Sequence, residues 1–253
     1  MDLGLAGKKA IVTGSTRGIG RQTVELLAAE GCAVAIGSRN ADAVAETVAA
    51  IQAAGGTAVG APVDVSDGPA YRQWIADMGE QLGGVDIFIH NVSGGAGMDG
   101  EASWYRCFEG DVMGAFRGCE AVMPFMEKAG GGSIIFMSTT AAVETFMAPM
   151  AYNALKGSLI IYAKQLSQVL MAKNIRVNVV SPGPIFIEGG SWDRIKENRP
   201  EVYAQNVAVQ PSNRLGTPAE VATCLTFLAS DAAGWVTGIN LVVDGGYTKR
   251  VQL

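Results

Sequence analysis

The sequence predicts an α/β fold in which helices cover both faces of a doubly wound, parallel sheet of seven strands. Short runs rich in β-branched residues alternate with segments of helical periodicity, and no linker, repeat or change of composition interrupts them. With 253 residues, 49% of them hydrophobic and 17% charged, the chain is long enough to bury one large core. Strands that alternate with helices pair in parallel through right-handed crossovers. We therefore expect a single domain that spans residues 1–253.

The expected strands and helices follow one another along the whole chain. The strands are short apolar runs, which occupy residues 10–14, 33–36, 57–65, 86–90, 133–137, 175–180 and 239–243. The helices are marked by apolar residues three or four positions apart, in segments that include residues 18–30, 44–51, 74–82, 104–126, 155–170 and 221–228. The last helix has a clear start, because Thr217, Pro218 and Glu220 combine a capping side chain, a first-turn proline and an acidic partner.

One segment, roughly residues 185–214, breaks this alternation. It carries most of the late charges of the chain together with Trp192 and Tyr203. Long connections in compact domains often carry function. We expect this segment to be a mobile cover over a ligand.

Composition excludes several classes of function. The net charge is −5 and no stripe of Lys and Arg occurs, which argues against a nucleic-acid-binding protein. A single histidine, His90, excludes zinc sites built on two or three imidazoles, and the absence of a Gly-x-Ser-x-Gly motif argues against a serine hydrolase. The four cysteines stand far apart, as in proteins of a reducing compartment, and no segment resembles a signal peptide or membrane span. We expect a soluble cytoplasmic protein without metal, nucleic-acid or membrane partners.

A glycine-rich turn follows the first strand and opens the first helix. It consists of Gly14, Ser15, Thr16, Arg17, Gly18, Ile19 and Gly20. Glycines allow backbone N–H groups to approach a pyrophosphate, and the helix N-terminus adds partial positive charge. A tight turn without any ligand is the simpler alternative, but the preceding strand and the following helix favour a dinucleotide site.

The second strand ends in Ser38, Arg39 and Asn40, where NAD-specific sites usually place an acidic residue. A carboxylate would repel a 2′-phosphate, whereas an arginine and a hydroxyl bind one. Arg17 is a candidate for a second positive charge, although both arginines are also compatible with a solvated surface. The sequence therefore favours NADP(H) over NAD.

A tyrosine and a lysine four positions apart, Tyr152 and Lys156, lie at the start of a helix, on one face and about 5 to 6 Å apart. A lysine at about 5.5 Å contributes roughly 3 kcal/mol at an effective dielectric of 20. That is most of the roughly 4 kcal/mol needed to lower a tyrosine pKa from about 10 to about 7. This pair also occurs on ordinary surface helices, but Thr139 and Ser138 end the fifth strand, at the sheet edge where ligands bind. We expect an acid–base site here.

The chain resembles the short-chain dehydrogenase/reductase family in the order and spacing of its motifs. These are TGSTRGIG, the pair Asp64 and Val65, HNVSGG, SIIFMSTT, YNALK, SPGPI and VDGGY. The resemblance covers nearly the whole chain. It implies a Rossmann-type fold with strand order 3-2-1-4-5-6-7, a nicotinamide dinucleotide, hydride transfer at a carbonyl or alcohol, and usually a homotetramer.

The resemblance also implies roles for particular residues. The catalytic Asn, Ser, Tyr and Lys of the family fall on Asp111, Thr139, Tyr152 and Lys156. The implied cofactor contacts are Asp64 and Val65 at the adenine, Asn91 near the ribose with Val92 and Ser93 in the same motif, and Pro182, Gly183 and Ile185 beside the nicotinamide.

Several positions depart from the family pattern, and three of them concern the proton chemistry or its surroundings. The family's serine falls on Thr139, and the adjacent Ser138 is an alternative. The family's asparagine falls on Asp111, which we interpret as a structural variant that keeps a backbone carbonyl for a proton relay, or else as a sign of changed proton handling. His90 replaces an asparagine and is expected to be structural.

The sequence thus predicts an NADP(H)-dependent oxidoreductase that interconverts a ketone and a secondary alcohol. Tyr152 exchanges the proton, Thr139 or Ser138 holds the substrate oxygen, and Lys156 tunes the tyrosine and binds the nicotinamide ribose. We expect a medium-sized, partly apolar substrate. Its expected surroundings are residues 94–98, 143–150 and 186–192, which include Phe146, Met147, Met150 and Trp192.

Two alternatives are kept. One is a 3-oxoacyl-acyl carrier protein reductase, in which Lys128, Lys173 and Arg176 would meet the acidic carrier. The other is a dinucleotide-binding sensor or scaffold that has lost catalysis, since function resides in sites rather than folds. The expected assembly is a homotetramer or a homodimer.

Overall fold

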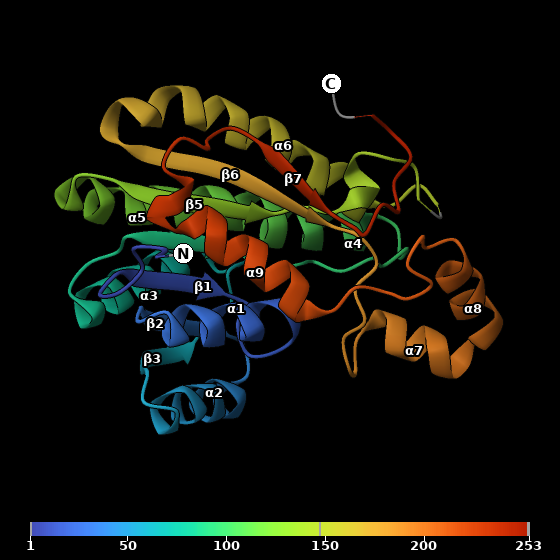
Figure 1. Ribbon diagram of the computed structural model, residues 1–253, viewed down its shortest axis with the longest axis horizontal. Coiled ribbons are helices and arrows are strands. Elements are labelled where there is room, and N and C mark those ends of the chain that lie inside the picture. Colours follow the sequence, from blue (N-terminus) through green and yellow to red (C-terminus); the bar gives the residue numbers. More distant parts are fainter. Residues whose placement is uncertain (1, 147, 252–253) are drawn as a thin grey trace.

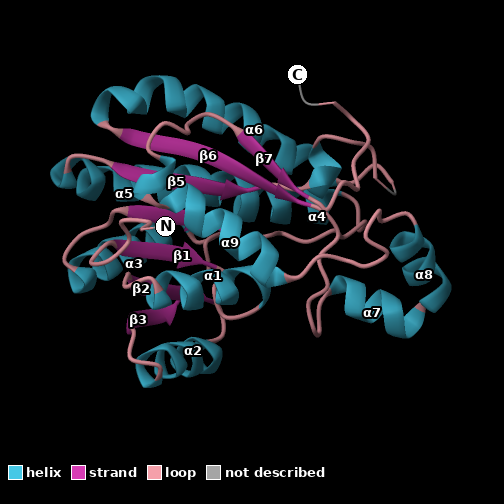
Figure 2. Cartoon of the chain, in the orientation of Figure 1, coloured by secondary structure: helices cyan, strands magenta, loops and turns pink. Residues whose placement is uncertain are grey.

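The computed structural model describes residues 2–146 and 148–251, and at its centre is a parallel sheet of seven strands (Figures 1 and 2). The order β3-β2-β1-β4-β5-β6-β7 confirms the predicted topology. The order reverses between β1 and β4, so a crevice opens at the carboxyl ends of these two strands. The strands are β1 (Lys9–Thr13), β2 (Ala33–Ser38), β3 (Thr57–Pro62), β4 (Ile87–His90), β5 (Gly132–Met137), β6 (Ile175–Pro182) and β7 (Asn240–Val243).

Helices cover both faces of the sheet, as predicted. One face packs against α1 (Gly18–Ala29), α2 (Ala41–Ala53) and α9 (Pro218–Ala229). The other packs against α3 (Gly68–Leu82), α5 (Gly114–Ala129) and α6 (Ala151–Leu170). Neighbouring residues of one strand serve opposite faces: in β1, Val12 belongs to the first apolar layer and Ile11 to the second. The central strands are therefore buried on both sides, which explains their continuous apolar runs.

The long helical region expected over residues 104–126 is confirmed, and it consists of three consecutive segments instead of one regular α-helix. They are α4 (Glu101–Cys107), a π-helical turn over Phe108–Met113, and α5. A π turn inserts a residue without interrupting the apolar pattern, so periodicity alone does not reveal it. After the turn the chain runs close to β4, since a Cβ at Gly114 would lie 2.8 Å from Cε1 of His90.

The segment 185–214 contains regular structure that the sequence reading did not anticipate. It forms α7 (Ser191–Asn198) and α8 (Pro200–Ala208), neither of which has a fully buried residue. Figure 1 shows both helices beyond the carboxyl ends of the strands, apart from the two helical layers. Their position agrees with a cover over the crevice, and their mobility stays a prediction.

Local signals at the ends of elements agree with the structure in one case and not in another. The predicted capping box at α9 is confirmed: Thr217 accepts from the Glu220 amide, and the Glu220 carboxylate accepts from the Thr217 amide at 2.8 Å. Strand β3, in contrast, ends at Pro62 rather than at residue 65, because its partner β2 ends at Ser38, which pairs with Pro62. None of the helices in the described ranges is both long and apolar enough to span a membrane.

Candidate active site

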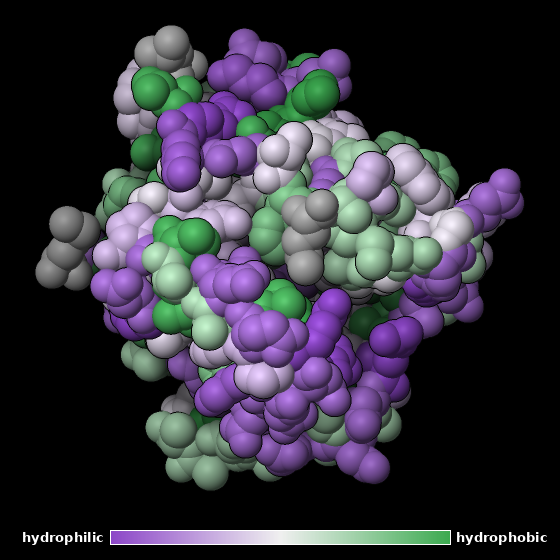
Figure 3. All heavy atoms as spheres, turned by 90° about the vertical axis from the view of Figure 1, so that its right-hand side faces the viewer, coloured by the Kyte–Doolittle hydropathy of each residue, from purple (hydrophilic) through white to green (hydrophobic). Residues whose placement is uncertain are grey.

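A cleft of about 1720 Å³ runs along the carboxyl ends of the strands, between the sheet and α7. Figure 3 views the molecule from this side, where hydrophilic and hydrophobic residues are interspersed. The residues that line the cleft come from loops after β1, β2, β3, β4, β5 and β6. Of the predicted site residues, those that line it are Gly14, Thr16, Arg17, Gly18, Ile19, Ser38, Arg39, Asp64, Val65, Asn91, Val92, Ser93, Ser138, Thr139, Tyr152, Lys156, Pro182, Gly183 and Ile185.

Four predicted site residues do not line the cleft but contribute to the structure around it. Ser15 is buried, and its hydroxyl donates to the Val12 carbonyl and accepts from the Gly37 amide. Gly20 lies so close to the Gly14 carbonyl that an added Cβ would overlap that oxygen. Asn40 uses its side chain to cap α2, and Asp111 is buried beneath the floor of the cleft.

The glycine-rich turn leaves the start of α1 open toward the cleft. Gly14 and Gly18 have φ angles of +64° and +54°, which favour glycine. No side chain caps α1 and its first turn has no acidic residue, whereas Asn40 and Asp67 cap α2 and α3. The first backbone N–H groups of a helix need an acceptor. Their freedom here fits the phosphate groups of a dinucleotide.

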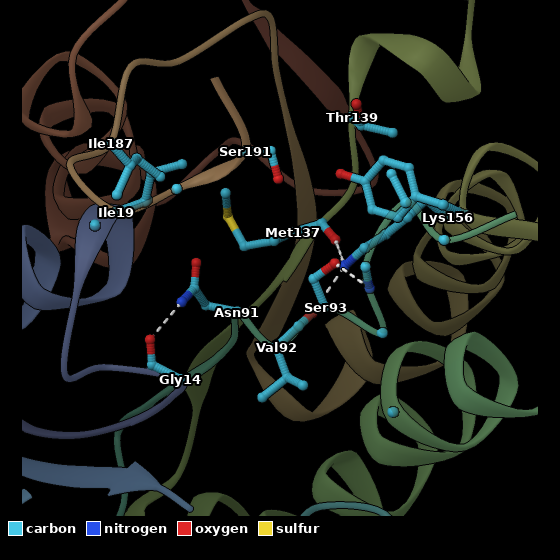
Figure 4. A pocket seen from close by; sticks show the side chains of 18 of the residues that line it. Gly14, Ile19, Asn91, Val92, Ser93, Met137, Thr139, Lys156, Ile187 and Ser191 are labelled. Atoms are coloured by element: carbon cyan, nitrogen blue, oxygen red, sulfur yellow. Dashed lines mark hydrogen bonds between the residues drawn. The ribbon is translucent and has the colours of Figure 1, made fainter. Parts of the chain in front are cut away.

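Asn91 fastens this turn to the end of β4. Its side-chain amide donates to the Thr13 carbonyl at 3.2 Å and to the Gly14 carbonyl at 2.9 Å, and Figure 4 shows the bond to Gly14. On the opposite wall Ile187 lies beside Ile19, so the start of the cover segment meets the first turn of α1 (Figure 4). The turn is therefore held from both sides of the crevice.

The end of β2 places Ser38 and Arg39 in the cleft, next to Asp64 from the β3 loop. The pKa of Asp64 is lowered, mainly by hydrogen bonds from Ser66 and to a smaller degree by the charge of Arg39. The two charged side chains therefore share one end of the cleft. Asn40 points elsewhere, because its carboxamide oxygen accepts from the Ala43 amide at 3.0 Å.

Lys156 is almost fully buried, with 2% of its side chain exposed. Its ammonium group donates to the carbonyls of Val92 and Met137, at 2.9 and 2.7 Å (Figure 4). It also lies 3.1 Å from Oδ1 of Asp111, whose carboxylate accepts from the Gly94 amide at 3.1 Å. The lysine thus joins β4, β5 and the π-helical turn.

His90 is buried at the end of β4, where it supports the π-helical turn. Burial, followed by the charge of Lys156, lowers the pKa of His90 to about 3, so the ring is neutral at physiological pH. Its Nε2 lies 3.0 Å from the Gly110 carbonyl and therefore carries the proton, which leaves Nδ1 to accept from the Thr13 hydroxyl at 3.4 Å. These contacts agree with the structural role expected for His90.

The two hydroxyl residues after β5 have different surroundings. The Ser138 hydroxyl donates to the Lys156 carbonyl at 2.8 Å and so anchors α6. The Thr139 oxygen accepts from the Ala141 amide at 3.3 Å, and its hydroxyl is within hydrogen-bonding reach of Tyr152. Of the two, Thr139 is the one placed to meet a ligand together with Tyr152.

The predicted lowering of the Tyr152 pKa is not found. Burial raises this pKa above its usual value, and it outweighs the lowering effects of the Lys156 charge and the Thr139 hydrogen bond. The nearby Asp111 carboxylate raises the pKa further. The expectation rested on the spacing of Tyr152 and Lys156, which contains no information about a third charged residue.

Two cations of the cleft were not expected from the sequence, one on α7 and one between α7 and α8. Arg194 and Arg199 line the cleft, and no ion pair is found for either within the described ranges. The only signal in the sequence is the charge content of segment 185–214. Of the expected substrate surroundings, Phe146, Met150 and Trp192 line the cleft, whereas Met147 lies outside the described residues.

The proposed carrier-protein patch is not supported. Arg176 is buried and donates to the carbonyls of Leu228 and Ser230, at 2.8 and 3.0 Å. Lys173 forms an ion pair with Glu127 at 2.6 Å. Two of the three cations therefore have partners within the protein.

Comparison with known proteins gives matches over nearly the full length of the chain. The model of the family described as enoyl-(acyl carrier protein) reductase matches residues 14–248. An isoepoxydon dehydrogenase of Penicillium expansum is 36% identical over 256 residues, and the match covers 98% of each chain. A 7α-hydroxysteroid dehydrogenase of Escherichia coli is 34% identical and covers 99% of this chain and 98% of its own.

Solved structures give the same result. A 7α-hydroxysteroid dehydrogenase in complex with NADH and 7-oxo glycochenodeoxycholic acid has a TM-score of 0.91 and 32% identity, covering 99% of this chain and 98% of that one. The L-sorbose reductase of Gluconobacter frateurii, in complex with NADPH and L-sorbose, has a TM-score of 0.91 and 29% identity, covering 99% and 100%. Sequence motifs, strand order and these matches agree, and the chain belongs to the short-chain dehydrogenase/reductase family of oxidoreductases.

Proposed function

We propose that this protein interconverts a ketone and a secondary alcohol, with NADP(H) as the hydride carrier. The observation that carries the proposal is the meeting of Tyr152, Thr139 and Lys156 at one end of a cleft whose other end fits a dinucleotide. A phenol and a hydroxyl on one side of a cavity are suited to bind and protonate a carbonyl oxygen. The relatives named as dehydrogenases of alcohols support this reaction class.

The residues of the cleft fit a phosphorylated dinucleotide. The uncapped start of α1 would receive the pyrophosphate, and Ser38 and Arg39 would receive a 2′-phosphate. In the described part of the chain Arg17, Arg39, Arg194 and Arg199 line the cleft without an ion-pair partner, although the protein carries a net charge of −5. Related structures contain NADH in one case and NADPH in another, so the preference for NADP(H) rests on Arg39 and the missing carboxylate.

The side chains of this protein supply the proton chemistry. When bound, the nicotinamide would supply the hydride for reduction or accept it in oxidation. Tyr152 donates its phenolic proton to the carbonyl oxygen, and Thr139 holds that oxygen by a hydrogen bond. Lys156, fixed by backbone carbonyls, holds the end of β4 and the end of β5 in register beneath the reacting groups.

The substrate end of the cleft favours a partly apolar molecule of medium size. Phe146, Met150 and Trp192 supply apolar surface, and Phe146 and Trp192 lie 6.4 Å apart between ring centroids. Relatives are named for a hydroxysteroid and for a dichlorocyclohexadiene diol, both cyclic secondary alcohols. We therefore propose a cyclic ketone or secondary alcohol as the substrate class.

A substrate panel with a matched pair of variants tests this function. Cyclic and open-chain ketones are mixed with NADPH or NADH, and the loss of nicotinamide absorbance is followed. Tyr152→Phe should lower turnover by at least about a hundred-fold, since general acid catalysis contributes roughly 10² to 10⁴, while cofactor binding stays within a few-fold. Tyr162→Phe, at a tyrosine of α6 that does not line the cleft, is the control for loss of a phenol.

Two outcomes would contradict the proposal. Cofactor binding without turnover of any substrate would favour the sensor or scaffold alternative. Turnover by Tyr152→Phe equal to that of the unaltered protein would remove Tyr152 from the role of proton donor.

A further inference from the structure

The active site contains a buried ion pair that the proposed reaction leaves unexplained. Nζ of Lys156 lies 3.1 Å from Oδ1 of Asp111, and the two side chains are only 2% and 0% exposed. Removing two charges from water costs several kcal/mol per ion, and this cost offsets much of their mutual attraction. A buried ion pair is therefore weak evidence for a role in stability. A contribution to the chemistry is the alternative, because the pair lies directly beside Tyr152.

Lys156 has two backbone carbonyls and one carboxylate around its ammonium group. Its N–H groups donate to the Val92 carbonyl at 2.9 Å and the Met137 carbonyl at 2.7 Å. Figure 4 shows these two contacts converging on the lysine from different segments. The Asp111 carboxylate lies 3.1 Å away and forms an ion pair with it. Among the described residues, Asp111 is therefore the only charged partner of the lysine.

The position of Asp111 is itself set by neighbouring groups. Its carboxylate accepts from the Gly94 amide at 3.1 and 3.3 Å. The residue before it, Gly110, accepts through its carbonyl from the buried His90 ring at 3.0 Å. Both contacts tie the π-helical turn to the end of β4. The carboxylate is thus held at the lysine by groups that do not titrate near neutral pH.

The titratable groups around Tyr152 and its partner Lys156 come from four elements. They are Lys156 on α6, Asp111 on the π-helical turn, Cys107 on α4 and His90 on β4. His90 is neutral because burial lowers its pKa to about 3, and Cys107 is neutral because burial raises its pKa to about 11. Within the described residues this leaves one positive and one negative group facing the phenol, and the negative group offsets part of the effect of the positive one.

We propose that Asp111 is a positioning residue that holds Lys156 and offsets part of its charge at Tyr152, so that the tyrosine keeps its proton at neutral pH and the site is set for reduction. This inference rests on the proposed function. In the reductive step the Tyr152 O–H bond breaks, its proton goes to the carbonyl oxygen, and the carbonyl carbon accepts the hydride that NADPH supplies. The phenolate then recovers a proton from water.

The direction of the pH dependence follows from this arrangement. Alcohol oxidation needs the phenolate as base, so its rate rises with pH through the pKa of Tyr152, and carbonyl reduction needs the phenol and falls over the same range. The pKa of Tyr152 is raised above its usual value, which agrees with an oxidation rate that increases only in alkaline solution. Removal of the Asp111 charge leaves Lys156 unopposed and moves both profiles to lower pH.

A titration without cofactor or substrate tests Asp111 directly. The ultraviolet absorbance of phenolate is followed against pH in the unaltered protein and in Asp111→Asn, each corrected by its Tyr152→Phe counterpart. We expect Tyr152 to ionise above about pH 10 in the unaltered protein, and about one pH unit or more lower in Asp111→Asn, as for loss of a like charge within about 4 to 6 Å. Asp111→Ser, which is also neutral, should shift in the same direction.

The controls separate charge from folding and from the proposed function. Glu120→Gln removes an exposed carboxylate on α5 and should leave the Tyr152 titration unchanged. Circular dichroism identifies a variant that does not fold. In that case the titration of the unaltered protein still tests the proposal, because ionisation of Tyr152 near pH 7 would overturn it. Equal titration curves for folded Asp111→Asn and the unaltered protein also overturn it.

Kinetics give a second and independent measurement. If the protein reduces ketones, the acid limb of kcat/KM for alcohol oxidation should move to lower pH by the same amount in Asp111→Asn, with Glu120→Gln unchanged. A purely structural Asp111 would lower kcat at every pH without moving the limb. If no substrate turns over, the proposed function fails, whereas the phenolate titration still supports or overturns the role of Asp111.

Discussion

Ser138 and Thr139 carry the same functional group in adjacent positions, yet their hydroxyls have different tasks. At the carboxyl end of a buried strand, neighbouring side chains point to opposite faces. Ser138 faces α6 and donates to the Lys156 carbonyl, whereas Thr139 lies in the cleft near Tyr152. From the sequence both residues were candidates for holding the substrate oxygen. The alternation of side chains along a strand predicts that they point in opposite directions, but it does not predict which of them points toward the ligand.

Arg39 provides a residue-scale prediction about the cofactor. Arg39→Leu should lower the ratio of kcat/KM for NADPH to that for NADH by about ten- to a hundred-fold, since a hydrogen bond to a charged group contributes roughly 1.5 to 3 kcal/mol. The measurement is steady-state kinetics with both cofactors. Arg72→Leu, at an exposed arginine of α3, is the charge-matched control. An unchanged ratio in Arg39→Leu would remove this residue from recognition of the 2′-phosphate.

At the scale of single elements, the helices differ in whether a side chain caps their first turn. The starts of α2, α3 and α9 are capped by side chains and contribute to stability, whereas the start of α1 is uncapped and faces the cleft. The cap of α9 was readable from the sequence because it depends on residues within one turn, whereas Asn40, which caps α2, was expected to contact the cofactor. The π-helical turn was not readable, since it depends on how the chain packs against β4.

The capping box of α9 supplies an element-scale prediction. Thr217→Ala should lower the free energy of unfolding by about 1 kcal/mol, because an amide of the first turn loses its acceptor. Thr223→Ala, at an exposed position of the same helix, should be neutral within about 0.5 kcal/mol. Denaturant unfolding followed by circular dichroism measures both. Equal stability of the two variants would show that the box contributes nothing.

At the scale of the whole molecule, the surface beside β7 has exposed apolar residues next to an open strand edge, which predicts association with a second copy of the chain. Strand β7 is the last strand of the sheet. It pairs with β6 on one side, and its other edge has no neighbouring strand within the described sheet. Trp235 is 94% exposed next to it, and Ile239 is also exposed. An open strand edge with a large apolar residue marks a site of association. We therefore predict a homodimer or homotetramer in which a second copy covers this edge.

Light scattering after size-exclusion chromatography tests the assembly. Trp235→Arg should lower the molar mass of the main species or weaken association by at least about ten-fold, because a large apolar contact is replaced by a charge that must be desolvated. Ala54→Arg, at an exposed residue after α2, adds the same charge near the opposite edge of the sheet and should have no effect. A monomeric protein at all concentrations would contradict the prediction.

The sequence by itself determined the alternation of strands and helices, the order of the sheet and the glycine-rich turn, because each depends on local pattern or on motifs at fixed spacing. It also identified Tyr152 and Lys156 as a pair on one helix face. Only the tertiary structure decided what surrounds that pair, since Asp111 and His90 reach it from elements far away along the chain. Burial and the like charge of Asp111 act through space, so the raised pKa of Tyr152 followed from the packed site and not from the spacing of its residues.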